Sequence, residues 1–180
     1  MLSGAGRLVA SRVLLGLVPL VSGCAGYQLG NRTLYQADIQ TVYVPVFESD
    51  SLRRNLGERL TEAVVKEIET KTPFKVLSDP ALADSVLTGR LVYERKNVLA
   101  ENRDDEPRDL ETNLVVVVNW LDRQGFARLQ ASTFSLSQQG FSVAQSADFV
   151  PEAGQSISTA QQEAIQRIAK QIVSQMEAPW

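Results

Sequence analysis

The sequence contains no histidine and only one cysteine, Cys24, among its 180 residues. Without histidine the chain lacks the usual general base near neutral pH and the commonest metal ligand. A single cysteine forms neither an internal disulfide nor a cysteine-based zinc site. The sequence also lacks a G-x-S-x-G nucleophile motif, a glycine-rich phosphate loop and a calcium-binding loop. We therefore predict a protein that is not an enzyme and that uses no metal and no cofactor.

Carboxylates are the main reactive groups that remain. A carboxylate pair or a Ser-Lys dyad would still permit a hydrolase, but no spacing in the sequence supports either. The cluster Asp104-Asp105-Glu106 could bind a hard cation, although a run of charges is more often a solvated loop. The formal net charge of −3 makes nucleic acid an unsuitable partner.

Cys24 follows a short apolar run in the arrangement of a bacterial lipoprotein signal. Two arginines make a positive start, residues 13–21 are largely apolar, and small residues lead up to the cysteine. The apolar run is shorter than the roughly 20 residues that span a bilayer, so it indicates a targeting segment. We predict a signal peptide over residues 1–23, cleavage before Cys24, and acylation of Cys24 by several chains, palmitate among them, which together anchor a protein firmly.

Cleavage there would place the mature chain outside the cytoplasm. It would remove Arg7 and Arg12, which leaves a net charge of −5. Ala25 follows the cysteine, at a position where aspartate retains many Gram-negative lipoproteins at the inner membrane. Its absence favours a lipid anchor in the outer membrane.

Residues 24–38 predict a short tether, because glycines and polar residues there show no apolar period. A tether of this length reaches at most about 50 Å when fully extended, which favours a partner at the membrane. A single folded domain is expected over residues 39–180.

Alternating or β-branched residues predict five strands, at 39–47, 74–77, 85–99, 114–121 and 126 to about 141. Pro45 in the first predicts an edge position or a bulge, and Gly89 in the third predicts a bulge or a close backbone approach. Leu87, Gly89, Leu91 and Tyr93 should share one face of the third strand. The four valines at 115–118 indicate burial on both faces or a second covered surface. Residues 101–109 predict a polar hairpin loop.

Two amphipathic helices are predicted from the spacing of apolar residues. The first spans 52–70, carries Leu52 on its apolar face, and is ended by Pro73. The second starts at a capping box of Ser158 and Gln161 and runs to about residue 176, before Pro179. The order β-α-β-β-β-β-α favours an α+β two-layer sandwich, in which two helices pack on one face of a mixed four- to five-stranded sheet.

These segments resemble the LptE family of lipopolysaccharide-assembly lipoproteins. The similar segments are Gly23 to Leu29, the strand with Val42-Tyr43-Val44-Pro45, Leu60-Thr61-Glu62-Ala63, Ala83-Asp84 before Leu87 and Gly89, and the closing helix with Trp180. The resemblance implies an outer-membrane lipoprotein that plugs an LptD-like β-barrel, the lipopolysaccharide translocon, and assists its assembly. It also implies contact with lipopolysaccharide during transport, and a fold that agrees with the pattern above.

Contact with lipopolysaccharide phosphates would favour clustered arginine and lysine. Arg90, Arg95, Lys96 and Arg103 lie along one predicted strand and its loop, and they are the candidate ligand-binding residues. The competing interpretation is four ordinary solvent-facing cations. An alternative function for the chain is a periplasmic lipoprotein that binds and activates a peptidoglycan synthase, because fold class alone does not separate the two.

Overall fold

The computed structural model describes residues 34–103, 106–129 and 140–177. Cys24 and the predicted signal peptide lie outside these residues. The elements are β1 (Thr41–Tyr43), β2 (Glu48–Ser49), α2 (Leu56–Lys71), β3 (Lys75–Leu77), β4 (Ser85–Glu101), β5 (Pro107–Asp122), β6 (Phe141–Phe149), the short 3₁₀ helix η3 (Pro151–Ala153) and α3 (Ile157–Ser174).

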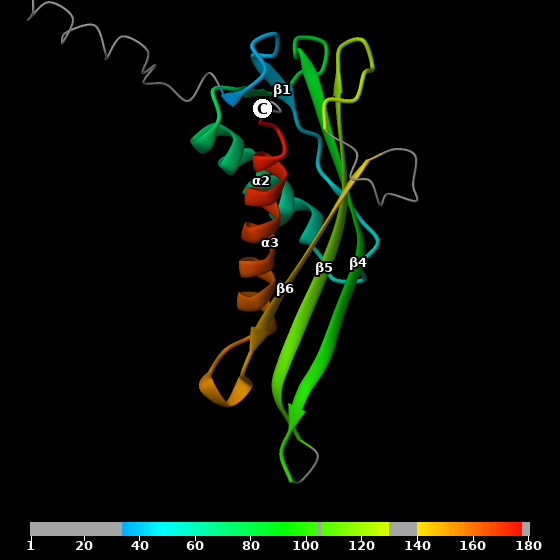
Figure 1. Cartoon of the computed structure of the whole chain (residues 1–180). Helices are drawn as coiled ribbons and strands as arrows, with labels where there is room; N and C mark the ends of the chain where they lie inside the picture. Colours follow the sequence, from blue (N-terminus) through cyan, green and yellow to red (C-terminus); the bar gives the residue numbers. More distant parts are fainter. Residues whose placement is uncertain (1–33, 104–105, 130–139, 178–180) are drawn as a thin grey trace, which may run out of the picture. The chain divides into compact units, whose positions relative to one another are not determined.

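One mixed sheet has the strand order β3-β1-β4-β5-β6, with β2 beside β4. β1 pairs in parallel with β3 and β4, whereas β4, β5 and β6 form an antiparallel meander. Both helices lie along the same side of this sheet (Figure 1). The predicted α+β two-layer fold is therefore confirmed. The sheet has six strands rather than four or five, because the two-residue β2, just after the first predicted strand, also pairs with β4.

The core lies between the helices and the inner face of the sheet, defined here as the face that the helices cover. Every second residue of β5 from Leu110 to Trp120 is buried, which is the period of a strand with one covered face. Trp120 is fully buried, and its Nε1 donates to Ser85 Oγ at 2.9 Å. The valine run follows the same alternation, because Val116 and Val118 are buried while Val115 and Val117 are only half-buried. Burial of the run on both faces was therefore the wrong interpretation.

The first predicted strand ends early, before Pro45, and the chain after it packs Phe47 into the core. β1 ends at Tyr43, two residues before Pro45, and β1 lies between β3 and β4, so Pro45 interrupts a strand rather than marking a sheet edge. The chain then turns the Phe47 ring onto Gly89. A Cβ added at Gly89 would lie 2.4 Å from that ring, which confirms the predicted close approach.

A β-bulge reverses the faces of β4 beyond Leu91. The pairing with β5 shifts between Leu91 and Tyr93, so Val92 is an extra residue. Tyr93 is consequently 43% exposed on the outer face, and the prediction that it shares a face with Leu87 and Leu91 was wrong. Glu94 takes the inward position instead, opposite Leu114.

Both helices begin elsewhere than the sequence patterns predicted. α2 starts at Leu56 behind Asn55, whose left-handed φ of 63° ends the preceding loop, and Leu52 is fully exposed rather than part of the apolar face. In α3 the N-cap is Ser156, because its side chain accepts from Thr159 N at 3.2 Å, so the capping box at Ser158 was the wrong register. α3 ends at Ser174, before the predicted stop at Pro179.

Three predicted boundaries also move. β4 and β5 both extend toward their turn, so the loop predicted at 101–109 contains only residues 102–106 between the strands. Of the strand predicted from 126 to about 141, residues 130–139 lie outside the described residues, and 126–129 form only an isolated bridge between Ala127 and Leu121. The strand that pairs with β5 is β6, and it starts at Phe141, where the predicted strand ended.

The folded part begins before residue 39. Tyr35 is 6% exposed, its ring packs edge-on against Phe74 with centroids 5.4 Å apart, and it forms a bridge with Glu177. Residues 34–38, which we expected in the tether, therefore belong to the folded unit.

Candidate partner-binding surfaces

The outer face of the sheet, which no helix covers, carries the first candidate surface. Here β4 contributes Thr88, Arg90, Tyr93, Arg95 and Asn97, and β5 places Asn119, Val117, Val115, Asn113 and Glu111 opposite them. Polar residues therefore surround a half-buried valine pair. Between Leu110 and the β4–β5 turn no described strand pairs with the outer side of β5, and the hairpin continues past the N-terminal start of α3 (Figure 1).

The structure places Arg90 on this face but beside acids. Its Nη2 lies 2.8 Å from Asp50 Oδ1 and its Nε lies 3.0 Å from Asp50 Oδ2, with Glu48 3.9 Å away. The bond to Asp50 raises the pKa of Arg90. The charge of Arg90 is therefore already balanced within the chain, which reduces what it offers to an anionic ligand.

Arg95 lies on the same face, one outward position beyond Tyr93. A side-chain hydrogen bond with Tyr93 raises the pKa of Arg95, and no carboxylate in the described part of the chain forms an ion pair with it. Lys96 follows on the opposite face by register, and Arg103 lies in the hairpin turn. The four predicted cations therefore do not form one cluster: only Arg90 and Arg95 share a face.

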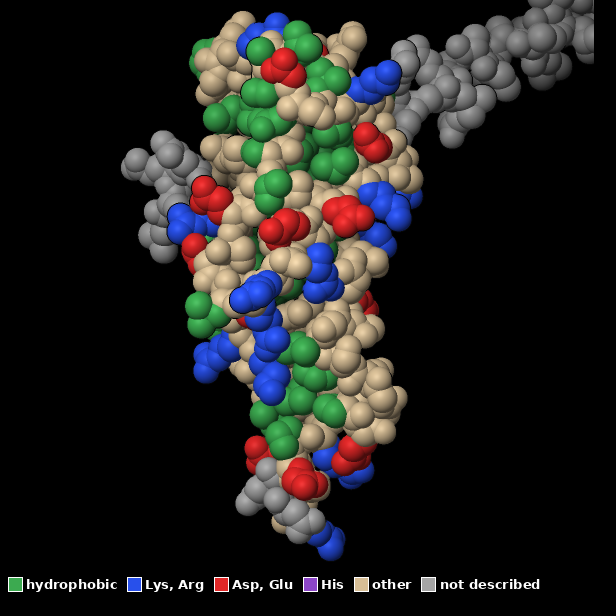
Figure 2. Space-filling model, turned by 180° about the vertical axis from the view of Figure 1, so that it is seen from behind, with side chains coloured by type: hydrophobic (Ala, Val, Ile, Leu, Met, Phe, Trp, Pro, Cys, Tyr) green, Lys and Arg blue, Asp and Glu red, His purple; other side chains and the backbone are tan. Residues whose placement is uncertain are grey.

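Side chains of both charges lie on this side of the molecule. Figure 2, which views the side opposite to that of Figure 1, shows lysine and arginine gathered midway, acidic side chains beside them, and apolar patches above and below. A shallow hollow of about 330 Å³ lies on it, between Pro45, Val46, Arg90 and Val117.

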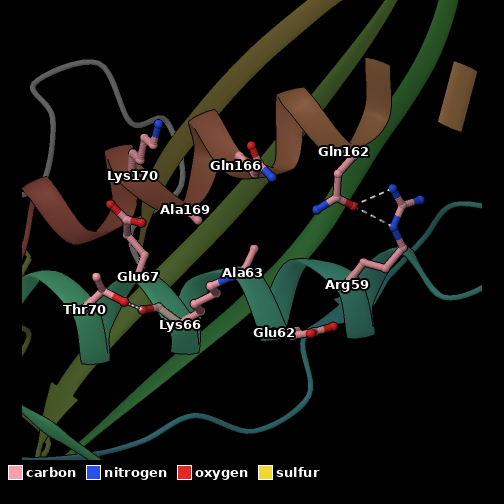
Figure 3. Close-up of a pocket in the computed structure, with 10 residues that line it drawn as sticks. All are labelled: Arg59, Glu62, Ala63, Lys66, Glu67, Thr70, Gln162, Gln166, Ala169 and Lys170. Atoms are coloured by element: carbon pink, nitrogen blue, oxygen red, sulfur yellow. Dashed lines mark hydrogen bonds between the residues drawn. The ribbon is translucent and has the colours of Figure 1, made fainter. Parts of the chain in front are cut away.

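A groove between α2 and α3 is the second candidate surface (Figure 3). It has a volume of about 340 Å³, and the small side chains of Ala63 and Ala169 line it. At one end Arg59 Nη2 donates to Gln162 Oε1 at 2.7 Å. Lysines and glutamates both line its walls, so the groove does not select a ligand of one charge.

Glu94 forms a polar cluster that the sequence did not indicate. Its side chain is only 11% exposed, and it accepts from Arg53 Nε at 2.7 Å, Ser51 Oγ at 2.7 Å and Gln161 Nε2 at 3.0 Å. These partners come from the loop before α2 and from the second turn of α3. Glu94 therefore ties that loop and α3 to β4, and only the bulge at Val92 turns it inward.

We expect Glu94→Ala to destabilise the fold by about 2 kcal/mol, because it leaves the buried Gln161 amide without its acceptor and Arg53 without its partner. Glu94→Gln retains an acceptor oxygen and should cost about half as much. Urea unfolding followed by circular dichroism measures both. Equal stability of Glu94→Ala and the wild type would contradict this role.

Two carboxylates fix the end of the sheet where β1 meets β4. Asp84 Oδ2 accepts from the Thr41 hydroxyl at 2.8 Å and from the backbone N–H groups of Gln40 and Thr41. The Thr41 hydroxyl bond is the main cause of the lowered pKa of Asp84. Burial acts against it, while the two N–H bonds and the Arg123 charge add to it.

Asp122 occupies the turn after β5. Burial acts to raise its pKa, but N–H donation from Phe126 and Gln124 and the bond from Arg128 outweigh burial, so the pKa is lowered. Arg128 Nη2 lies 2.8 Å from Asp122 and 2.9 Å from Asp38. Arg128 therefore joins this turn to the start of the folded unit.

The lowered pKa values of Asp84 and Asp122 predict a loss of stability in acid. A carboxyl group whose pKa is lower in the folded state stabilises the fold at pH values above its ordinary pKa of 3.8. That stabilisation disappears as the pH falls from 3.8 through the lower pKa of the folded state. The melting temperature should therefore decrease as the pH is lowered below about 4. Asp122→Asn should melt lower at pH 7 and show a shallower decline in acid, and an identical pH profile would contradict the assignment.

The described residues contain no group of three acidic, histidine or cysteine side chains able to hold a metal ion. Of the predicted Asp104-Asp105-Glu106 cluster only Glu106 is described, and its Oε2 accepts from Asn102 Nδ2 at 3.0 Å. Among the described helices, none combines the length and apolar character needed to cross a membrane.

Comparisons with known proteins agree with the architecture. The sequence matches the family model LptE, described as lipopolysaccharide-assembly, over residues 39–178. None of the curated proteins matches the chain in sequence. Among solved structures, an uncharacterized lipoprotein B from Nitrosomonas europaea is 16% identical with a TM-score of 0.50, and the match covers 82% of this chain and 90% of that one. The PelC dodecamer from Paraburkholderia phytofirmans is 11% identical with a TM-score of 0.50, covering 80% and 93%. At these identities the two structures support the fold alone.

Proposed function

Because this chain belongs to the LptE family of lipopolysaccharide-assembly proteins, we propose that it plugs an LptD-like β-barrel, the lipopolysaccharide translocon. The role in lipopolysaccharide assembly, as a non-enzymatic envelope lipoprotein, is that of the family. The proposal adds the barrel partner, help with the assembly of that barrel, and the place of action. That place is the outer membrane, reached through a signal peptide over residues 1–23, an acylated Cys24 and a tether that ends before Leu34.

The outer face of the sheet is the observation that carries this proposal. The lumen of a large membrane barrel is polar, so a plug needs a polar surface of mixed charge. The outer face meets that requirement: the Arg90–Asp50 pair, Arg95 and several amide and hydroxyl side chains surround only a small apolar centre. The β4–β5 hairpin extends this surface beyond the helices (Figure 1), as insertion into a lumen requires.

Affinity purification of the acylated chain from detergent-solubilised outer membranes tests the proposal. We expect a barrel of the translocon type to co-purify. Recovery of a peptidoglycan synthase without a barrel would instead support the alternative function, in which the chain activates that enzyme.

For lipopolysaccharide contact we propose Arg95 as the main cation of the predicted set, with Arg90, Lys96 and Arg103 in lesser roles. Arg95 is exposed and forms no ion pair with a described carboxylate, whereas Arg90 is held by Asp50. Arg95→Ala should weaken binding of purified lipopolysaccharide more than Arg90→Ala does. Equal binding by wild type and Arg95→Ala would show that Arg95 is an ordinary solvent-facing cation.

A further inference from the structure

β6 is the last strand of the sheet, and one of its edges is open. It pairs with β5 at nine consecutive positions, from Phe149 opposite Leu110 to Phe141 opposite Val118, without a register shift. No other described strand lies beyond it. An open strand edge presents a row of backbone donors and acceptors that another strand can pair with.

Two hydrogen bonds show which residues of β6 face this open edge. Ser146 O accepts from Arg167 Nη1 at 2.8 Å, and Val150 N donates to Gln155 Oε1 at 2.8 Å. Neither partner belongs to β5. Since backbone direction alternates along a strand, the even-numbered residues point their N–H and C=O groups away from β5.

These outward groups of β6 have almost no partners. Apart from the Arg167 contact at Ser146 O, no hydrogen bond to a described residue engages the backbone of Ser142, Ala144, Ser146 or Asp148 on that side. The same four residues place small or short side chains on the outer face of the sheet. An approaching strand would therefore meet little steric obstruction.

The far half of β4 provides an internal contrast. It too has no described strand beside it on one side beyond Leu91, but it contains three register shifts and the consecutive charged residues Glu94, Arg95 and Lys96. Bulges and charges are the features that keep strand edges from pairing. β6 has no bulge, no proline and no lysine or arginine, and Asp148 is its only charged residue. The far half of β4 thus has a protected edge, whereas β6 does not.

We propose that the open edge of β6 binds an extended segment of the barrel partner by β-strand addition, an inference that rests on the proposed function. Main-chain hydrogen bonds would supply the affinity. The incoming N–H would take over Ser146 O from Arg167. The released guanidinium keeps its ion pair with Glu163, so the exchange leaves no charge without a partner.

Ala144→Pro tests this pairing, with Ala144→Ser as the matched control. Proline removes an N–H that points away from β5, so it blocks the open edge and leaves the β5–β6 pairing intact. Serine keeps the N–H. In the affinity purification, Ala144→Pro should recover about tenfold less barrel than wild type, which corresponds to the loss of one to two main-chain bonds. Ala144→Ser should recover as much as wild type.

Hydrogen exchange on the wild-type chain keeps the test independent of whether Ala144→Pro folds. The amides of Ala144, Ser146 and Asp148 should exchange more slowly in the purified complex than in the free chain. Equal exchange in both states, or undiminished barrel recovery by a folded Ala144→Pro chain, would overturn the inference and leave the proposed function standing.

Two other outcomes have separate meanings. Slow exchange of these amides in a free chain that is dimeric by light scattering would show that a second copy of the chain pairs with the edge. It would overturn the proposal that a barrel segment binds there. If the wild type recovers no barrel at all, the proposed function fails, and this inference fails with it.

Discussion

A chain carrying Cys24→Ala is expected to lose its membrane anchor completely and to fractionate with soluble periplasmic proteins. Each methylene of a buried acyl chain contributes about 0.8 kcal/mol, so several acyl chains on one residue hold a protein at the membrane, and losing them all releases it. Alanine offers no thiol to acylate. Mass spectrometry of the purified chain and membrane fractionation measure the two effects.

The control for this substitution is Ala25→Ser, which leaves the cysteine in place and should remain acylated. Because the described fold starts at Leu34, Cys24→Ala should keep the melting temperature of the wild-type domain. An unmodified thiol in native material, or membrane retention of Cys24→Ala equal to wild type, would remove the lipid anchor from the proposed function.

Gly57→Ala is expected to destabilise the domain by about 3 kcal/mol, the upper end of the usual cost of overpacking. The sign is the informative part, since alanine inside a helix normally stabilises it relative to glycine by about 0.5–1 kcal/mol. Here a Cβ at Gly57 would lie 2.2 Å from the backbone oxygen of Phe47. A backbone oxygen cannot rotate aside as a side chain can, so α2 would have to move away from the sheet.

The surroundings of Phe47 make that movement costly. Phe47 N donates to Thr61 Oγ1 at 2.8 Å, and Thr61 Oγ1 donates to Gly57 O at 2.8 Å. Displacing α2 from the Phe47 backbone breaks the first of these bonds. Ala63→Gly in the same helix is the matched control and should cost about 1 kcal/mol through helix propensity alone. Urea unfolding of both variants measures the difference, and a stabilising Gly57→Ala would refute the contact.

The fold class could be predicted from the sequence because its main patterns are periodic. The alternation of Leu87, Gly89 and Leu91 in β4 and the apolar stripe of α3 each indicate a buried face, and two such helices need one sheet to cover. The prediction of a close approach at Gly89 also held, since glycine in a strand has few other uses. Such features depend on residues close together in the sequence.

The errors occur where a distant contact or a local irregularity overrides the pattern. Tyr93 has the spacing of a core residue, but the extra residue Val92 reverses the strand before it. Ser158 has the spacing of a cap, but Ser156 is the residue whose side chain reaches the helix N–H groups. Tyr35 lies in a glycine-containing polar stretch, and only its contact with Phe74, 39 positions later in the sequence, places it in the core.

The candidate site could be predicted only as a list of cations. Spacing along one strand suggested that Arg90, Arg95 and Lys96 act together, but alternation and the bulge place Lys96 on the other face. The pairing of Arg90 with Asp50 joins residues 40 positions apart, and no local pattern indicates it. Glu94 was missed for the same reason, since its partners come from the loop before α2 and from α3.

The extra residue at Val92 also means that β4 tolerates a change of length here in one direction only. Leu91 lies opposite Val116 and Tyr93 lies opposite Val115, so a chain without Val92 would keep the same pairs in an unbroken ladder, with Glu94 still on the inner face. A second residue inserted beside Val92 and taken into the ladder would instead shift every later residue by one and turn Glu94 toward solvent. Homologous chains are therefore free to lose this residue, but not to gain another beside it.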